Sequence, residues 1–355
     1  MPSLRTWMSH LPDDALLNSI VLPATHDTGM SFQILGAEQY LNPLQYFASG
    51  AMGAIAGIDD LLSSDRDHQL FHDNFTTQIY NVYNQLIRGA RQLDLRITKH
   101  AGTYRAYHGS VLQTIAGARR YGETWTWICR GIAQFISENP SEFLILKLDK
   151  QKTYTTEMLT ILNDELNDQY PAPQIAGDLL CYYIDKEPIR KLRGRVLVCG
   201  KSHALKDWKK IPNLNRSITF CQWKKAESGD NPTTPDMRLG AGTDPVYQLL
   251  GSSEGDLSKK ENVLLKQASM AAKFPATRTA GMRGIWFNTF SYLRDIKTYS
   301  DAVWSAPQTS RDDLWLAGNN RQNVASIDFL NTAKANYVIQ KNLHADFRDM
   351  HFDGP

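Results

Sequence analysis

The sequence lacks the features that mark several common protein classes. Its 355 residues contain no apolar run near the ~20 residues that a membrane-spanning helix needs. A formal net charge of +2 gives no sign of the basic face that nucleic-acid binding requires, so we expect no nucleic-acid partner. Cysteines are few, and no CxxC pair is present. We therefore expect reduced core residues rather than a disulfide framework or a zinc site at the four cysteines, Cys129, Cys181, Cys199 and Cys221.

The first residues also lack a familiar targeting pattern. Residues 1–14, MPSLRTWMSHLPDD, show no basic segment followed by an apolar core, as a secretory signal would. A cytoplasmic protein, export by a signal-independent route and a trimmed signal all fit this observation. The compartment and the oligomeric state therefore stay open at this point.

What the sequence does contain is a series of short apolar runs. Many are continuous rather than alternating, which favours parallel strands covered on both faces. Eight such runs are expected to form strands: Ile20–Ala24, Gln92–Thr98, Tyr104–His108, Phe143–Asp149, Val196–Gly200, Ile218–Trp223, Gly284–Phe290 and Val324–Phe329.

Helical patterns lie between many of these runs. Residues 125–138 are expected to form one helix that stops at Asn139-Pro140. Apolar stripes at helical spacing mark three more, at Ile79/Val82/Leu86/Ile87, Met158/Leu159/Leu162/Leu166 and Ala335/Val338/Ile339/Leu343.

Eight strands with interleaved helices predict an α/β fold, a distorted (β/α)8 TIM-type barrel in a single domain over 1–355. The barrel should be irregular, because the link between the second and third strands is too short for a helix. Residues 228–279, rich in Gly, Pro, Ser and Thr, are expected to be an insertion between strands six and seven.

Polar residues gather at the ends of the expected strands, where barrel enzymes carry their active sites. Strand one ends at His26-Asp27, and strand two carries Asp94 and Arg96, which point to one side because one residue separates them. The other members of this set are His108, Lys147 and Asp328, and strand order in a closed barrel would bring Asp328 beside His26.

This combination suits phosphoryl transfer. Two histidines can act as general base and general acid near neutral pH. A carboxylate beside a histidine fixes its tautomer, and an arginine offers a fork of donors to a phosphate. Each residue also has a structural alternative. A strand-end histidine can be merely hydrogen-bonded, Asp94 and Arg96 can form a buried ion pair, Lys147 can lie at a solvated strand end, and Asp328 can cap a helix.

Three stretches together resemble a known family. The runs TWMSHLPDDALLNSIVLPATHDTGM, GARQLDLRI and YHGS are similar to the X-domain of phosphatidylinositol-specific phospholipase C, in its bacterial, metal-independent type. The match is strongest over Trp7–Gly109, and FLILKLDK extends it. The resemblance implies a distorted TIM barrel that cleaves phosphatidylinositol to diacylglycerol and inositol 1,2-cyclic phosphate.

The resemblance also implies roles for individual residues. His26 would be the general base for the inositol 2-hydroxyl, and Asp328 would be its dyad partner. His108 would be the general acid for the leaving oxygen. Asp27 would orient Arg96 and His108, and Arg96 would stabilise the phosphate.

The same resemblance bears on substrate binding and on metals. Asp94 would belong to the hydrogen-bond network of the site, and Lys147 would contact the inositol or its phosphate. Trp223 is a candidate for stacking on the sugar, although a core or rim position explains it as well. Calcium-dependent relatives carry an acid at the position of Arg96, so neither a metal nor any other cofactor is expected.

A phosphoinositide lipid as substrate implies transient contact with a membrane interface. The apolar segment that follows His26 offers candidates for this contact, Leu44, Tyr46, Phe47, Met52 and Ile55, although a helix packed on the barrel fits the segment as well.

Two other functions compete with the phospholipase. The first is a glycerophosphodiester phosphodiesterase, whose metal cluster would need an ExD motif where this chain has LDLR. The second is a catalytically silent phospholipid-binding barrel, which need not keep both histidines, the arginine and the aspartate together. The sequence leaves the headgroup preference open.

Overall fold

The computed structural model describes residues 2–17, 20–31, 77–108, 120–148, 156–171, 188–200, 210–222, 284–287, 324–342 and 352–353. The expected insertion at 228–279, Trp223 and the five candidate interfacial residues lie outside these ranges.

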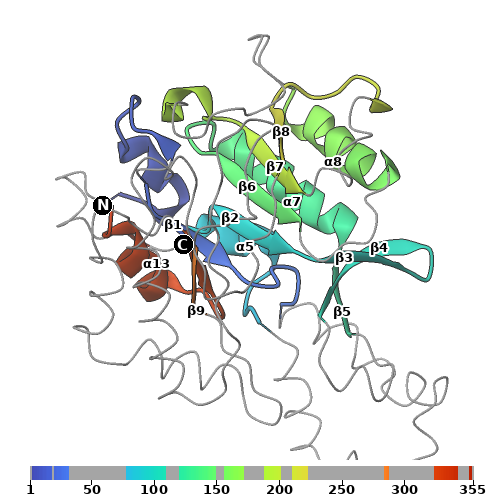
Figure 1. The fold of residues 1–355 in the computed structure, drawn as a ribbon, viewed down its shortest axis with the longest axis horizontal. Helices are drawn as coiled ribbons and strands as arrows, with labels where there is room; N and C mark the ends of the chain where they lie inside the picture. The colour runs from blue at the N-terminus through green and yellow to red at the C-terminus, as the bar shows by residue number, and fades with distance from the viewer. Residues whose placement is uncertain are drawn as a thin grey trace, which may run out of the picture.

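A parallel sheet of seven strands forms the centre of the fold (Figure 1). Its strand order is β8-β7-β6-β2-β1-β10-β9, and every pairing in it is parallel. In the part of the chain that the structure describes, the sheet is an open arc with β8 and β9 at its edges. The strands are β1 (Leu22–Thr25), β2 (Gln92–Leu95), β6 (Leu144–Leu148), β7 (Val196–Gly200), β8 (Ile218–Gln222), β9 (Gly284–Phe287) and β10 (Val324–Ile327).

The expected third barrel strand is not part of this sheet. It forms β4 (Thr103–His108), which pairs antiparallel with β3 (Ile97–His100) and β5 (Arg120–Thr124) in a separate sheet. The reason is the two-residue turn Ala101-Gly102, with φ of 46° and 83°. Such a turn folds a chain back on itself as a hairpin and cannot join parallel strands. The run expected as one strand over 92–98 is accordingly divided between the two sheets at Arg96.

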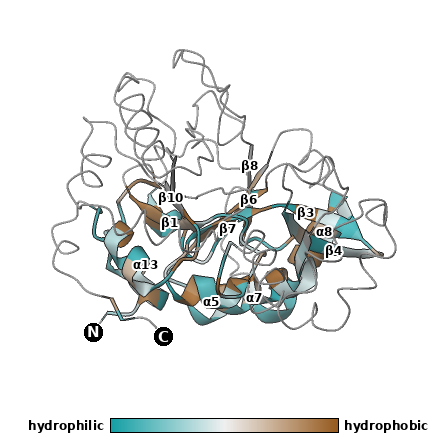
Figure 2. Cartoon of the chain, turned by 90° about the horizontal axis from the view of Figure 1, so that it is seen from below, coloured by the Kyte–Doolittle hydropathy of each residue, from teal (hydrophilic) through white to brown (hydrophobic). Residues whose placement is uncertain are grey.

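A helix lies at each of the four expected places, although α5 begins at Val82 and so leaves out Ile79, and Leu343 of the last stripe lies outside the described residues. Helix α7 (Trp125–Glu138) has the expected bounds: Thr124 caps it by accepting a hydrogen bond from the Trp127 amide, and it ends at Asn139 before a proline. Figure 2 shows α13, α5 and α7 in a row on one side of the sheet. The other helices are α5 (Val82–Ile87), α8 (Thr156–Gln169), α13 (Thr332–Ile339) and the 3-10 helices η1 (Leu4–His10) and η4 (Ile189–Lys191).

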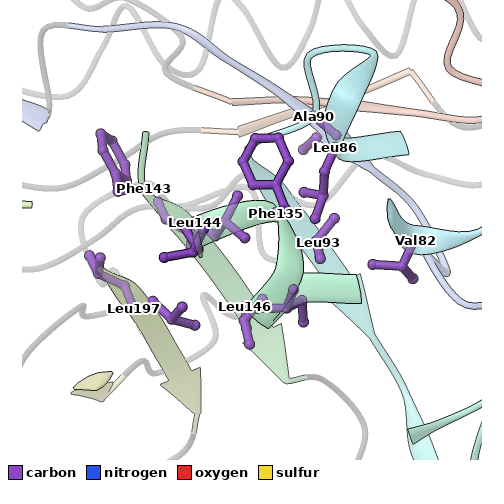
Figure 3. Packing of buried hydrophobic residues seen from close by; sticks show 14 of the residues in the cluster. Val82, Leu86, Ala90, Leu93, Phe135, Phe143, Leu144, Leu146 and Leu197 are labelled. Carbon is purple, nitrogen blue, oxygen red and sulfur yellow. The ribbon is translucent and has the colours of Figure 1, made fainter. Parts of the chain in front are cut away.

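The core lies between these helices and the sheet. Figure 3 shows Phe135 of α7 and Leu86 of α5 packed over Leu93 of β2 and Leu146 of β6, all with no exposed surface. Burying each such side chain contributes about 1.5–3 kcal/mol. Because side chains alternate along a strand, the polar residues beside these leucines in β2 and β6 project from the opposite face, away from the helices.

A buried ion pair lies at the amino-terminal ends of β2 and β6. Arg91, just before β2, contacts Oε2 of Glu142 through Nε (2.8 Å) and Nη2 (2.7 Å), and neither side chain is exposed. Arg91 also donates to the carbonyls of Leu4 and Arg5, so this pair ties η1 to the sheet. Cys129 and Cys199 are free and buried, as expected of reduced core cysteines.

Candidate active site

The carboxyl ends of β1, β2, β6 and β10 bring the expected polar residues together. Register pairs Thr25 with Ile327, so the next residues, His26 and Asp328, lie side by side. Register also pairs Asp94 with Lys147 across β2 and β6. All four of these polar side chains are buried, with at most 6% exposed.

His26 and Asp328 form a close pair. Nδ1 of His26 lies 2.9 Å from Oδ1 of Asp328, and Nη2 of Arg96 lies 3.1 Å from Nε2 of the same ring. A carboxylate only accepts hydrogen bonds and a guanidinium only donates them. The neutral imidazole therefore carries its proton on Nδ1, and the lone pair of Nε2 accepts a hydrogen bond from Arg96. The cap of α13 is Asn331, so Asp328 does not serve as the cap.

Asp27 occupies the middle of the cluster. Its Oδ1 lies 2.7 Å from Nε of Arg96, and its Oδ2 lies 3.4 Å from Nε2 of His26 and 3.3 Å from Nε2 of His108. The backbone of Asp27 has a φ of 41°, in the left-handed region that non-glycine residues adopt at a cost. In this turn after β1, the Asp27 carboxylate lies within 3.4 Å of His26, His108 and Arg96.

Two more ionisable residues extend the cluster along the sheet. Oδ2 of Asp94 lies 3.6 Å from Nη2 of Arg96, and Oδ1 of Asp94 lies 3.2 Å from Nζ of Lys147. The shorter contact of Arg96 is with Asp27, so the guanidinium is not simply an ion-pair partner of Asp94. Lys147 is only 4% exposed, which excludes the solvated strand end.

His108 reaches the site from the other sheet, as the last residue of β4. The Tyr107 amide donates to the carbonyl of Arg96 at 2.9 Å and so fixes the end of β4 beside the end of β2. The rings of His26 and His108 have centres 6.4 Å apart and are inclined at 80°. The two imidazoles of the cluster therefore come from different sheets.

The two histidines differ in electrostatic environment. Burial lowers the pKa of His108 to about 4, and the Asp27 carboxylate only partly opposes that effect. Burial also disfavours charge on His26, but Asp27 and Asp328 together outweigh burial and raise the pKa of His26 above 6.5.

The donor set of this cluster does not suit a metal ion. His26, Asp27 and Asp94 each offer a ligand atom, and these atoms lie within 4.8 Å of one another. The Arg96 guanidinium contacts all three residues and places a fixed positive charge in their midst. A divalent cation would be repelled there, so the residues present do not fit a metal.

Sequence reasoning missed residues that support the site without touching its centre. The Gln78 side chain contacts the backbone at the ends of both β1 and β10. Lys334 donates from Nζ to the Asp328 carbonyl at 3.2 Å. Neither belongs to a motif, and no signal in the sequence singles them out. Trp223 lies outside the described residues, so its role stays a prediction.

Comparisons with known proteins agree with the resemblance seen in the sequence. No protein-family model matches the chain. A segment of 207 residues, 57% of this chain, is 23% identical to 1-phosphatidylinositol phosphodiesterase of Listeria monocytogenes, and it spans about half (50%) of that relative.

Solved structures match over nearly the whole chain. The phosphatidylinositol-specific phospholipase C of Listeria monocytogenes has a TM-score of 0.55 at 17% identity, with 96% of this chain and 99% of that chain covered. The Staphylococcus aureus phosphatidylinositol-specific phospholipase C has a TM-score of 0.57 at 13% identity, with 96% and 98% covered. At these identities the likeness shows the fold: the parallel arc is that of the distorted TIM-type barrel of bacterial phospholipases C, as the sequence predicts.

Proposed function

We propose that this protein is a metal-independent phospholipase C that cleaves phosphatidylinositol to diacylglycerol and inositol 1,2-cyclic phosphate. The observation that carries this proposal is the buried constellation of two histidines, one dyad carboxylate and one arginine around Asp27. As part of the proposal, the chain forms a single domain. The relatives named for phosphatidylinositol support the choice of substrate.

His26 acts as the general base. Its Nε2 lone pair takes the proton of the inositol 2-hydroxyl, and the oxygen then attacks phosphorus. Oδ1 of Asp328, 2.9 Å from Nδ1 of His26, accepts the Nδ1–H hydrogen bond. That bond keeps the imidazole proton on Nδ1 and not on Nε2, and it stabilises the imidazolium that forms. The dyad thus supplies both the tautomer and the orientation that proton abstraction needs.

His108 acts as the general acid for the departing oxygen of diacylglycerol. It faces His26 across the site, so the proton enters on the side where the leaving group departs. Water can then open the cyclic phosphate with the two histidines in exchanged roles. Asp27 contacts both rings and keeps their relative positions fixed during these steps.

Arg96 stabilises the charge that develops on the phosphoryl oxygens. Its guanidinium is held by Asp27 before substrate arrives, so little reorganisation is needed during the reaction. Lys147 and Asp94 are proposed to contact the inositol hydroxyls or phosphate, since they line the same face of the sheet.

Contact with a membrane is part of the proposal because the substrate resides in a bilayer. The Staphylococcus aureus phospholipase C was solved in connection with modulation of its membrane binding, so a relative of the same fold engages membranes. Among the described residues, no helix is long and apolar enough to cross a membrane. Transient binding at the interface is therefore the mode that we propose.

A glycerophosphodiester phosphodiesterase remains the enzymatic alternative, and a silent lipid-binding barrel the non-enzymatic one. The first needs a metal cluster where Arg96 places a cation, and the second leaves the paired histidines without a role. Both alternatives are less well supported by the geometry than the phospholipase.

The test is phosphorus NMR of phosphatidylinositol vesicles in EDTA, with His26→Ala as the control. The expected result is a cyclic inositol phosphate signal with the wild type and none with the control. Activity that is lost in EDTA and restored by calcium would overturn metal independence. No product with or without calcium would overturn the proposed reaction.

A further inference from the structure

Gln78 lies where β1 and β10 end, and none of its surface is exposed. Its Nε2 donates to the carbonyl of His26 at 3.0 Å and to the carbonyl of Ile327 at 2.9 Å. Its Oε1 accepts from the Leu330 amide at 3.2 Å. One side-chain amide therefore uses both of its N–H groups and its carbonyl to join the two chain segments that carry the dyad.

Backbone hydrogen bonds join the segments after β1 and β10 only as far as His26 and Ile327. The His26 amide donates to the Ile327 carbonyl at 3.2 Å, the last ladder bond between the segments. Directly beyond it, both chains turn through the left-handed region, with φ of 41° at Asp27 and 52° at Phe329. The imidazole and carboxylate are thus attached just where regular strand pairing stops.

We propose that Gln78 is a positioning residue for the reaction: it holds the His26 and Asp328 backbones at the separation that lets Nδ1 of His26 donate to Oδ1 of Asp328. Such a bond tolerates a shift of only a few tenths of an ångström before it weakens. Gln78 contacts both segments and neither side chain of the dyad, so it acts through backbone geometry alone.

Gln78 is itself fixed by neighbouring backbone contacts. Its amide donates to the Met30 carbonyl at 3.2 Å, and the Thr77 carbonyl accepts from the Phe329 amide at 2.7 Å. The Thr77 hydroxyl donates to the Asp27 carbonyl at 3.0 Å. Residues 77–78 therefore form a strap across the turns that follow β1 and β10, and the glutamine side chain has a fixed starting point.

Asn342 offers a matched control at the opposite end of β1. Its Nδ2 donates to the carbonyls of Val21 (3.0 Å) and Ile339 (2.8 Å), and its Oδ1 accepts from the Val21 amide at 2.7 Å. It has the same three amide–backbone bonds as Gln78 and is 1% exposed. It differs in lying away from the dyad, so it reports the purely structural effect of losing such an amide.

The experiment compares Gln78→Met and Asn342→Leu with the wild type, each with labelled histidine. Proton–nitrogen NMR follows the downfield Nδ1–H signal of His26 and its titration, assigned with His26→Ala. In Gln78→Met we expect that signal to move upfield and the pKa of His26 to fall, because the Asp328 contact that raises it is weakened. In Asn342→Leu both should match the wild type.

Activity gives the second readout, and it alone rests on the proposed function. On phosphatidylinositol vesicles, Gln78→Met should lower kcat about 10- to 100-fold with little change in KM, the scale expected from a small misplacement of a catalytic group. Wild-type protein without activity would defeat the proposed phospholipase, whereas the NMR comparison would still decide the role of Gln78.

Identical His26 signals in Gln78→Met and the wild type would overturn the proposal, and so would equal changes in both variants. If Gln78→Met does not fold, Gln78→Glu replaces it. That change keeps the shape and the acceptor for the Leu330 amide, but it removes both donated bonds when the carboxyl is ionised and one of them when it is protonated. An unchanged His26 signal in that variant would overturn the proposal in the same way.

Discussion

The imidazole rings of His26 and His108 lie 6.4 Å apart at 80°, yet their surroundings drive their protonation in opposite directions. His26 faces the carboxylates of Asp27 and Asp328, which raise its pKa above 6.5. For His108 burial dominates and lowers the pKa to about 4. Without substrate, the proposed base therefore takes up a proton more readily than the proposed acid.

The first prediction concerns pH dependence. The reacting form needs neutral His26 and protonated His108, so it is a minority form. We expect kcat/KM to rise through about pH 4 and to fall above pH 6.5, with the alkaline limb belonging to the base, His26. NMR titration of the two rings checks the assignment. A ligand-free protein in which His108 titrates above His26 would contradict it.

The second prediction concerns the buried acid Glu123. Burial raises its pKa to about 7 from 4.5, although its Oε2 accepts from the Val82 amide. A carboxyl with a raised folded-state pKa stabilises the fold below its unfolded pKa, and that stability is lost as the pH rises from about 4.5 through about 7.

Glu123→Gln keeps the acceptor and stays neutral. Relative to the wild type, we expect the variant to gain on the order of 3 kcal/mol in unfolding free energy between pH 4 and pH 8. Urea unfolding at the two pH values measures this difference. Wild-type and variant curves that run parallel across the range would rule out titration of Glu123 as the cause.

The third prediction concerns the buried ion pair between Arg91 and Glu142. Glu142→Gln leaves the fully buried Arg91 without a counter-charge, and we expect a loss of about 3–5 kcal/mol in unfolding free energy. Asp13→Asn, which breaks an exposed ion pair, is the control. Oδ1 of Asp13 lies 3.0 Å from Nε of Arg193, but the Asp13 side chain is 69% exposed. We therefore expect Asp13→Asn to lower the unfolding free energy by no more than ~1 kcal/mol. If chemical denaturation shows equal losses of unfolding free energy in the two variants, the prediction is wrong.

The fourth prediction concerns the contact between the two sheets. The Glu123 amide donates to the Gly29 carbonyl at 2.9 Å, and a Cβ at Gly122 would overlap that same oxygen. Gly122→Ala should push β5 away from the turn after His26 and displace β4, which carries His108. We expect kcat to fall about tenfold or more.

Gly131→Ala on α7 is the control for that change, because its Cβ would meet nothing closer than 3.3 Å. Its activity should stay near that of the wild type. Phosphatidylinositol turnover at matched protein concentration, with circular dichroism to check folding, gives the measurement. Similar turnover in both glycine variants would mean that the close approach does not hold the acid in place.

Periodic patterns explain what the sequence could predict. Helix α7 has a capping threonine, an apolar stripe and a proline stop, so both of its ends were foreseeable. The pairing of His26 with Asp328 followed from strand order, since the ends of neighbouring parallel strands meet. The resemblance contributed the roles of these residues, which the comparisons of fold alone leave as proposals.

Other features leave no periodic trace. Alternating residues over 104–108 suit a barrel strand and a hairpin equally, and only the turn at Ala101-Gly102 distinguishes the two. The central place of Asp27 depends on its left-handed backbone, which the sequence pattern does not encode. Gln78 acts through carbonyls of distant segments, and hydrogen bonds of that kind depend on the finished fold.

The delivery of His108 by a sheet of its own has a consequence for how this site can change. In the proposed mechanism, Asp94 and Lys147 contact the inositol or its phosphate from the parallel strands β2 and β6. The proposed proton donor for the alcohol, His108, ends a strand of the antiparallel sheet that is tied to Arg96 and Gly29. Insertions or exchanges in that sheet would retune which alcohol departs while the headgroup chemistry stays intact. Under the proposed mechanism, the headgroup and the departing alcohol are thus served by side chains from different sheets.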